Sequence, residues 1–137
     1  MSLLRMWAHA FLECNHVVPI VQWAESFVRP LLGTDAKVSG DFWLWGLPSP
    51  GLTTSVISRA WYVFTVCKFF IWNRRCRFIF ENRFIPGDDV IKLIRNEIYV
   101  RVRADFKRLP SEEFERLWLV GNSFIKIDSN NKIVLIR

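Results

Sequence analysis

Residues 60–72 read AWYVFTVCKFFIW, the longest apolar run of the chain, and contain a single charge, Lys68. A bilayer span needs about 20 apolar residues, so this run predicts a buried helix rather than a membrane-spanning one. Thr53 or Thr54 can cap its start, which gives a long helix over residues 53–80. Because this helix is apolar on most sides, we expect neighbouring elements to cover most of its surface.

Upstream of this helix, residues 15–32 carry apolar side chains at three- and four-residue spacing, the pattern of a helix with one buried face. Asn15 is a suitable N-cap and Gly33 a natural stop. Residues 42–45, FWLW, form a short apolar run that fits a strand or a helix equally well.

Downstream, a Pro-Gly-Asp break ends at Asp88, which can cap a helix over residues 89–109. Ser111 can cap a short helix over residues 112–119. Two β-rich runs, 124–127 and 132–136, flank a DSNN turn and predict a β-hairpin. The chain therefore predicts a mainly α fold, a small domain of about four helices with a C-terminal β-hairpin.

Length and composition limit the class of protein. The chain has 137 residues, enough for one domain or a fragment of one. Its hydrophobic content of 51% and aromatic content of 15% exclude a disordered tail. Three cysteines are too few for a disulfide framework and favour a reduced, intracellular setting, the nucleus or the cytoplasm. Short apolar runs broken by Arg5 at the start argue against a secretory signal.

The net charge of +6 is concentrated in the middle of the chain, where residues 57–108 hold twelve bases and five acids. Such a block attracts the phosphates of nucleic acid or anionic lipid, although a solvated surface facing its own acids is an equal alternative. The candidate phosphate contacts are Arg74, Arg75, Arg77, Arg83, Arg101, Arg103, Lys107 and Arg108.

Aromatic side chains could add a platform for unpaired bases. The tryptophans that could contribute are Trp43, Trp45, Trp61, Trp72 and Trp118. Most of them fall at apolar helical positions, so packing in the core is the favoured interpretation.

His9 and Cys14 form an H-x4-C pair, and imidazole and thiolate are common zinc ligands. A structural zinc needs four ligands, and the sequence holds only half of such a site. His16 could be a third ligand, but its place at the start of the 15–32 helix favours a solvent-facing side chain.

Gly87-Asp88-Asp89 resembles the GDD sequence of polymerase palms, but the proline before it and the helical pattern after it favour a helix start. The sequence holds no Ser-His-Asp or Cys-His arrangement and no phosphate-binding G-x-x-x-x-G-K-[ST] loop. We therefore expect no catalytic activity.

The order of several motifs is more specific than any one of them. HAFLEC at 9–14 is followed by VVP at 17–19 and Trp23. Farther along come FWLWGLP at 42–48, IWNRR at 71–75, RVRADF at 101–106, LW at 117–118 and the final hairpin. This series, over almost the whole chain, resembles the C-terminal region of the polyprotein of LINE-type, non-LTR retrotransposons.

In that family the region follows the reverse transcriptase, carries a C-x2-4-C pair before its H-x4-C pair, and is assigned to template-RNA binding during target-primed reverse transcription. The resemblance implies a non-enzymatic fragment, because polymerase and endonuclease are absent, with weak, sequence-independent binding of RNA or other nucleic acid. The upstream polymerase would be a further partner. His9 and Cys14 match the second pair of the zinc-knuckle-like motif, so zinc would need ligands missing from this chain and no other cofactor is implied.

On this interpretation residues 1–14 are a remnant of the zinc-knuckle-like motif, 15–109 a helical body, and 110–137 a short helix with the hairpin. Two alternatives stay open. One is a decayed transposon remnant without autonomous function, whose exposed apolar surface once met the polymerase. The other is a helical module that docks a protein or a membrane surface through residues 56–80.

Overall fold

The computed structural model describes residues 10–11, 14–32, 38–48, 50–119, 125–130 and 132–135. Its longest element is α4, Thr54–Glu81, which confirms the helix predicted from the apolar run. The Thr53 hydroxyl accepts a hydrogen bond from the amide of Val56 at 3.4 Å and so caps the start. The helix ends at Asn82, whose φ of 53° is left-handed and whose N–H donates to the carbonyl of Arg77.

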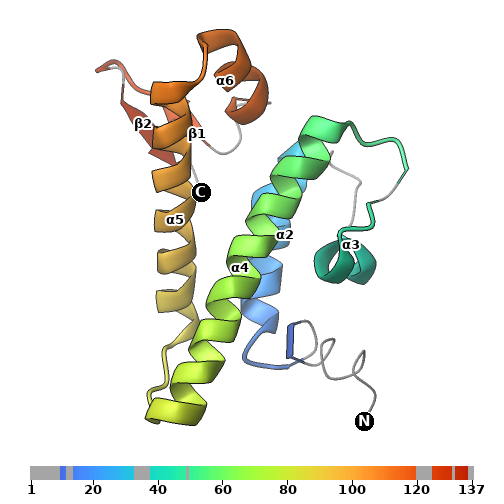
Figure 1. Cartoon of the computed structure of the whole chain (residues 1–137), viewed down its shortest axis with the longest axis vertical. Coiled ribbons are helices and arrows are strands. Elements are labelled where there is room, and N and C mark those ends of the chain that lie inside the picture. Colours follow the sequence, from blue (N-terminus) through green and yellow to red (C-terminus); the bar gives the residue numbers. More distant parts are fainter. Residues whose placement is uncertain are drawn as a thin grey trace.

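Two further helices pack on α4. Helix α2, Val18–Leu32, begins three residues after the predicted Asn15 cap, because the carbonyl of Cys14 accepts the N–H groups of Val17 and Val18 in a turn. The predicted stop at Gly33 lies outside the described residues. Helix α5, Gly87–Arg108, runs antiparallel to α4, to which it is joined at one end (Figure 1).

The predicted capping role of Asp88 is wrong. The capping position belongs to Pro86, which makes no side-chain cap, and Asp88 lies in the first turn of α5 together with Asp89. Carboxylates there still interact favourably with the positive end of the helix dipole. The Gly-Asp-Asp sequence therefore has a structural explanation at a helix start.

The core lies where α2, α4 and α5 meet. Each helix contributes side chains at the spacing that its sequence predicts, and all of the following are at most 3% exposed. They are Ile20, Ala24, Phe27 and Val28 of α2; Ala60, Val63, Phe64, Cys67 and Ile71 of α4; and Val90, Ile94, Ile98 and Val102 of α5.

The FWLW run forms a short helix, α3, Gly40–Trp45. The Ser39 hydroxyl accepts the amide of Phe42 at 3.1 Å, and Gly46, with φ of 73°, closes the other end. The ammonium of Lys68 donates to the carbonyl of Trp43 at 2.8 Å, so a cation from α4 satisfies the last turn of α3. This explains how the one charge in the long apolar run is accommodated.

The short last helix and the hairpin lie at the C-terminal end of α5, away from the α4–α5 turn (Figure 1). Helix α6, Ser111–Trp118, follows a capping Pro110, so Ser111 is its first residue rather than its cap. Strands β1, Ile125–Ile127, and β2, Ile133–Leu135, pair antiparallel and confirm the predicted hairpin; residues 124, 131 and 136 lie outside the described residues. The fold is mainly α with a small C-terminal hairpin, as the sequence predicts.

Coverage of α4 differs from expectation. The helix contacts α2, α3, α5 and α6. Most of its buried side chains lie in its N-terminal half, whereas several large apolar side chains of its C-terminal half are exposed. They are Phe69, Trp72, Phe78, Ile79 and Phe80, between 48% and 81% exposed. Among the described residues, no helix is both long enough and apolar enough to span a bilayer.

Candidate nucleic-acid interface

The eight bases predicted to contact phosphates form two groups rather than one stripe. Arg74, Arg75, Arg77 and Arg83 lie around the α4–α5 turn, while Arg101, Arg103, Lys107 and Arg108 lie near the C-terminal end of α5. At a rise of about 1.5 Å per residue, the start of α5 and Arg101 are roughly 21 Å apart. The antiparallel arrangement therefore gives two separate basic ends.

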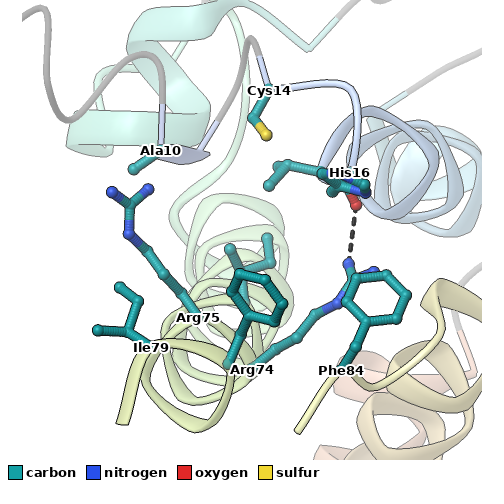
Figure 2. Close-up of a pocket in the computed structure, with 10 residues that line it drawn as sticks. Ala10, Cys14, His16, Arg74, Arg75, Ile79 and Phe84 are labelled. Carbon is teal, nitrogen blue, oxygen red and sulfur yellow. Dashed lines mark hydrogen bonds between the residues drawn. The ribbon is translucent and has the colours of Figure 1, made fainter. Parts of the chain in front are cut away.

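A hollow of about 310 Å³ lies beside the α4–α5 turn. Its walls come from three segments, of which the one before α2 is distant in the sequence from the other two (Figure 2). The segment before α2 supplies Cys14 and His16, α4 supplies Arg74 and Arg75, and the loop before α5 supplies Phe84. The fold thus brings part of the predicted metal motif next to part of the predicted basic block.

Arg74 is held inside this wall. It is only 8% exposed, and its Nη1 donates to the carbonyl of His16 at 2.8 Å. Its guanidinium lies 4.8 Å from the centre of the Phe84 ring, which also meets the His16 ring edge-on at 5.6 Å (Figure 2). Burial lowers the pKa of Arg74, and nearby Cys14 acts in the opposite direction. Arg74 therefore ties α4 to the segment before α2.

The other three bases of this end are more open to solvent. Arg75 and Arg83 are exposed, and neither has an ion pair within the described part of the chain. Arg77 donates to the Asn73 side chain at 2.9 Å and lies 3.9 Å from a carboxylate oxygen of Glu81. Arg75 and Arg83 are therefore the cations with the greatest freedom to meet a phosphate.

Exposed phenylalanines accompany these arginines. Phe78 and Phe84 are each 53% exposed and Phe80 is 81% exposed. Sequence reasoning weighed tryptophans as a base-stacking platform and missed these three rings. The sequence signal for these rings is the segment 74–84, RRCRFIFENRF, which holds four arginines and three phenylalanines.

The tryptophans mostly serve the core, as expected. Trp43 and Trp118 are at most 2% exposed, and Trp61 is half-buried against Lys68, whose ammonium lies 4.0 Å from the Trp61 ring centre. Trp45 and Trp72 are 45% and 48% exposed and belong to different helices, α3 and α4, and the Trp72 ring lies 6.1 Å from the Phe11 ring.

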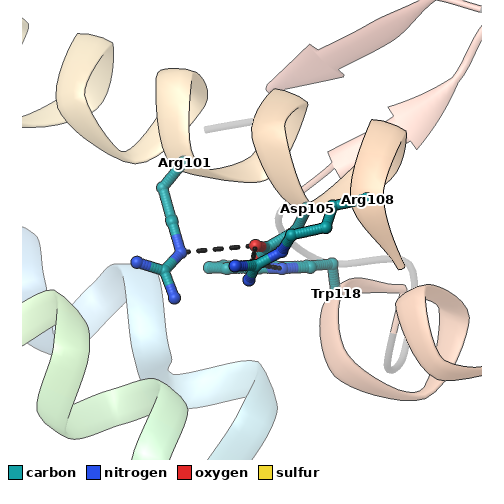
Figure 3. A network of polar contacts seen from close by, with 4 residues as sticks. All are labelled: Arg101, Asp105, Arg108 and Trp118. Carbon is teal, nitrogen blue, oxygen red and sulfur yellow. Dashed lines mark hydrogen bonds and ion pairs between the residues drawn. The ribbon is translucent and has the colours of Figure 1, made fainter.

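At that second end, two of the predicted phosphate contacts are already engaged (Figure 3). Asp105 is buried, and its Oδ1 accepts from Arg108 at 3.1 Å and lies 3.4 Å from Nε of Arg101. Its Oδ2 accepts the indole N–H of Trp118 in α6 at 3.0 Å. Asp105 therefore joins α5 to α6 through Trp118, and Arg101 and Arg108 pair with the same carboxylate from within α5.

The same network reaches α4. The Arg59 guanidinium is 7% exposed and stacks 4.6 Å from the centre of the Trp118 ring. Burial lowers the pKa of Arg59, and the charge of Asp105 raises it. Arg59 is thus a buried cation whose counter-ion is shared with two surface arginines.

Arg103 and Lys107, by contrast, are exposed and have no ion pair within the described residues. They line a second hollow together with residues of the hairpin. Sequence reasoning placed them on one flank of α5 but did not foresee that the hairpin would meet them.

The predicted zinc pair is not tested by this structure, because His9 lies outside the described residues. Within the described ranges, no three His, Cys, Asp or Glu side chains gather in a way that could hold a metal ion. Cys14 and His16 both border the hollow at the α4–α5 turn, where Arg74 already places a positive charge. Zinc binding at His9 and Cys14 stays a prediction from the family resemblance.

Comparison with known proteins adds no family to these observations. No protein-family model, no curated protein and no solved structure matches the chain. The geometry of the two basic ends is therefore the basis for a functional proposal.

Proposed function

We propose that the chain is a non-enzymatic module that binds single-stranded nucleic acid, with RNA as its ligand, at the α4–α5 turn. The observation that carries this proposal is a short segment with two exposed arginines, Arg75 and Arg83, and three exposed phenylalanine rings. Neither arginine has an acidic partner among the described residues.

The two residue types supply complementary interactions. Guanidinium groups contact phosphates and release counter-ions, and this contribution does not depend on base sequence. Aromatic rings stack on unpaired bases, each stacked base contributing about 1–3 kcal/mol, again with little sequence preference. A segment that offers both and holds four arginines against one glutamate between residues 74 and 84 fits a single strand better than a duplex.

The resemblance to the retrotransposon C-terminal region supports RNA as the ligand and an intracellular site of action, in the nucleus or the cytoplasm. It also supports the upstream polymerase of the parent element as a partner. These parts of the proposal depend on the resemblance alone, whereas the strand-binding surface depends on the geometry.

The proposal is tested by the fluorescence anisotropy of a labelled single-stranded RNA at rising salt. The variant Arg75→Gln/Arg83→Gln should bind more weakly and should lower the salt slope by about 1.4, since each contact with a single strand contributes about 0.7. The matched control Arg116→Gln/Lys126→Gln removes the same charge from exposed positions in α6 and the hairpin and should leave the slope unchanged.

A second variant separates stacking from charge. Phe80→Ser should weaken RNA binding at every salt concentration without changing the slope, because stacking releases no counter-ions and the Phe80 ring is 81% exposed. Binding that does not respond to salt in the wild-type chain would contradict the proposal.

One observation favours a second function, docking of a protein partner. Phe69, Trp72 and Phe80 recur on one face of α4 and are 48–81% exposed. Exposed apolar patches of this kind often mark interaction sites. If the chain does not bind RNA, stays insoluble alone and becomes soluble with the upstream polymerase segment, docking is the better account; flotation with anionic vesicles would instead indicate a membrane surface.

A further inference from the structure

A cleft of about 300 Å³ lies where the C-terminal half of α5 meets the hairpin. Its volume is at the lower end of the range for small-ligand sites, about 300–1,000 Å³. Six of the described residues line it: Tyr99, Arg103, Phe106, Lys107, Lys132 and Ile133. Three of the six are cations and none is an acid.

These three cations have no anionic partner among the residues that the structure describes. Arg103, Lys107 and Lys132 are exposed, and none makes an ion pair or a side-chain hydrogen bond within the described part of the chain. Arg103 and Lys107 are four residues apart and so share one face of α5, where like charges repel. Their neighbours Arg101 and Arg108 are compensated by Asp105.

Lys132 reaches the cleft because the hairpin turn is fixed. The Asp128 side chain accepts the N–H of Lys132 at 2.9 Å, and the Asp128 N–H donates to the carbonyl of Lys132 at 2.9 Å. Ile133 is 6% exposed and anchors the start of β2 in the core. A third positive charge is therefore held against α5 by backbone geometry rather than by a counter-ion.

The remaining walls are aromatic. Tyr99 lies one helical turn before Arg103, and the Arg103 guanidinium lies 5.7 Å from the centre of the Tyr99 ring. Phe106 is half-buried, and its ring packs edge-on against Phe114 of α6 at 5.1 Å. The cleft thus combines a cluster of uncompensated cations with flat apolar surface.

We propose that this cleft binds one nucleotide unit, with its phosphate on Arg103, Lys107 and Lys132 and its base against Tyr99. The site goes beyond the proposed strand-binding surface, because it lies at the opposite end of α5 and includes a hairpin residue. It does not require RNA binding at the α4–α5 turn.

The test is titration of the ¹⁵N-labelled full chain with adenosine monophosphate, inorganic phosphate and adenosine, followed by amide chemical shifts. Adenosine monophosphate should shift Tyr99, Arg103 and Ile133 and should bind more tightly than either of the other probes. Lys132→Gln should weaken this binding about fivefold, the effect of one exposed cation–phosphate contact. Lys126→Gln, which removes the same charge from the other strand, should change it less than about twofold.

Four results would overturn the inference: equal binding of adenosine and its monophosphate, equal binding of inorganic phosphate, equal weakening by Lys126→Gln, or no shifts around the cleft. Lys132 is exposed, and its side chain makes no hydrogen bond or ion pair within the described residues, so its substitution should leave the fold intact. A chain that binds adenosine monophosphate here but binds no RNA oligonucleotide would retain this site and lose the proposed function.

Discussion

The carboxylate of Asp105 is the residue whose removal we expect to destabilise the fold most. It is 4% exposed and accepts hydrogen bonds from α5 and α6 while offsetting a buried cation on α4. In Asp105→Ala, the indole N–H of Trp118 loses its acceptor and Arg59 loses its nearest negative charge. Both groups stay buried, so neither can turn to water for compensation.

The size of the effect follows from these two losses. Removing one partner of a buried charged network costs about 3–5 kcal/mol, whereas Arg101 and Arg108, with side chains 51% and 68% exposed, add little. A domain of this length has a stability on the order of 10 kcal/mol, so the variant should still fold. At about 4 °C per kcal/mol, its Tm should fall by roughly 12–20 °C.

The assay is urea unfolding followed by tryptophan fluorescence, with three matched variants. Asp105→Asn keeps an acceptor for Trp118 and should cost clearly less than Asp105→Ala. Arg101→Gln and Arg108→Gln should each cost less than about 1 kcal/mol, because their pairs are exposed. If Asp105→Ala costs no more than Arg101→Gln, the carboxylate does not hold the helices together and the reasoning is wrong.

Two further predictions concern α3. Desolvation lowers the pKa of Lys68 to about 8, so between pH 8 and its ordinary value of 10.5 the unfolded chain keeps a proton that the folded chain releases. The free energy of unfolding of the wild-type chain, relative to that of Lys68→Met, should therefore rise with pH across this window. Urea unfolding measures both values, and a difference between them that stays constant from pH 7 to 10 would contradict this prediction. Gly46→Ala should lower the free energy of unfolding by about 1 kcal/mol because of the left-handed φ alone. The new Cβ would meet the Trp61 ring at 3.5 Å, an ordinary van der Waals contact. In thermal melting, Gly46→Asn should lower the Tm less than Gly46→Ala does.

The longer helices were predictable because each has an apolar period that its burial confirms. The short helix α3 was not, since a run of four apolar residues fits a strand as well. What makes it a helix is a cap on each side, Ser39 and Gly46, together with an ammonium from Lys68 on a different helix. Only the first two of these are local in the sequence.

The bases of the candidate site were predictable from the sequence, but its phenylalanines and its layout were not. Antiparallel packing of α4 and α5 separates two groups of bases that lie within 35 positions of each other in the sequence. The spacing of Asp105, four residues after Arg101 and three before Arg108, already indicated helical ion pairs. The approach of Lys132 to α5 had no such local signal, because it depends on where the hairpin folds back.

The division of the bases into engaged and open ones determines how strongly salt should affect binding. Arg74, Arg77, Arg101 and Arg108 contact carbonyl, amide or carboxylate oxygens of their own chain, whereas Arg75, Arg83, Arg103 and Lys107 do not within the described residues. Arg75 and Arg83, the two open bases at the α4–α5 turn, would give a salt slope of about −1.4 on a single strand, whereas contacts from all eight bases would give about −5.6. The structure therefore favours the shallower slope, and a slope near −5.6 would mean that the engaged arginines leave their partners when RNA binds.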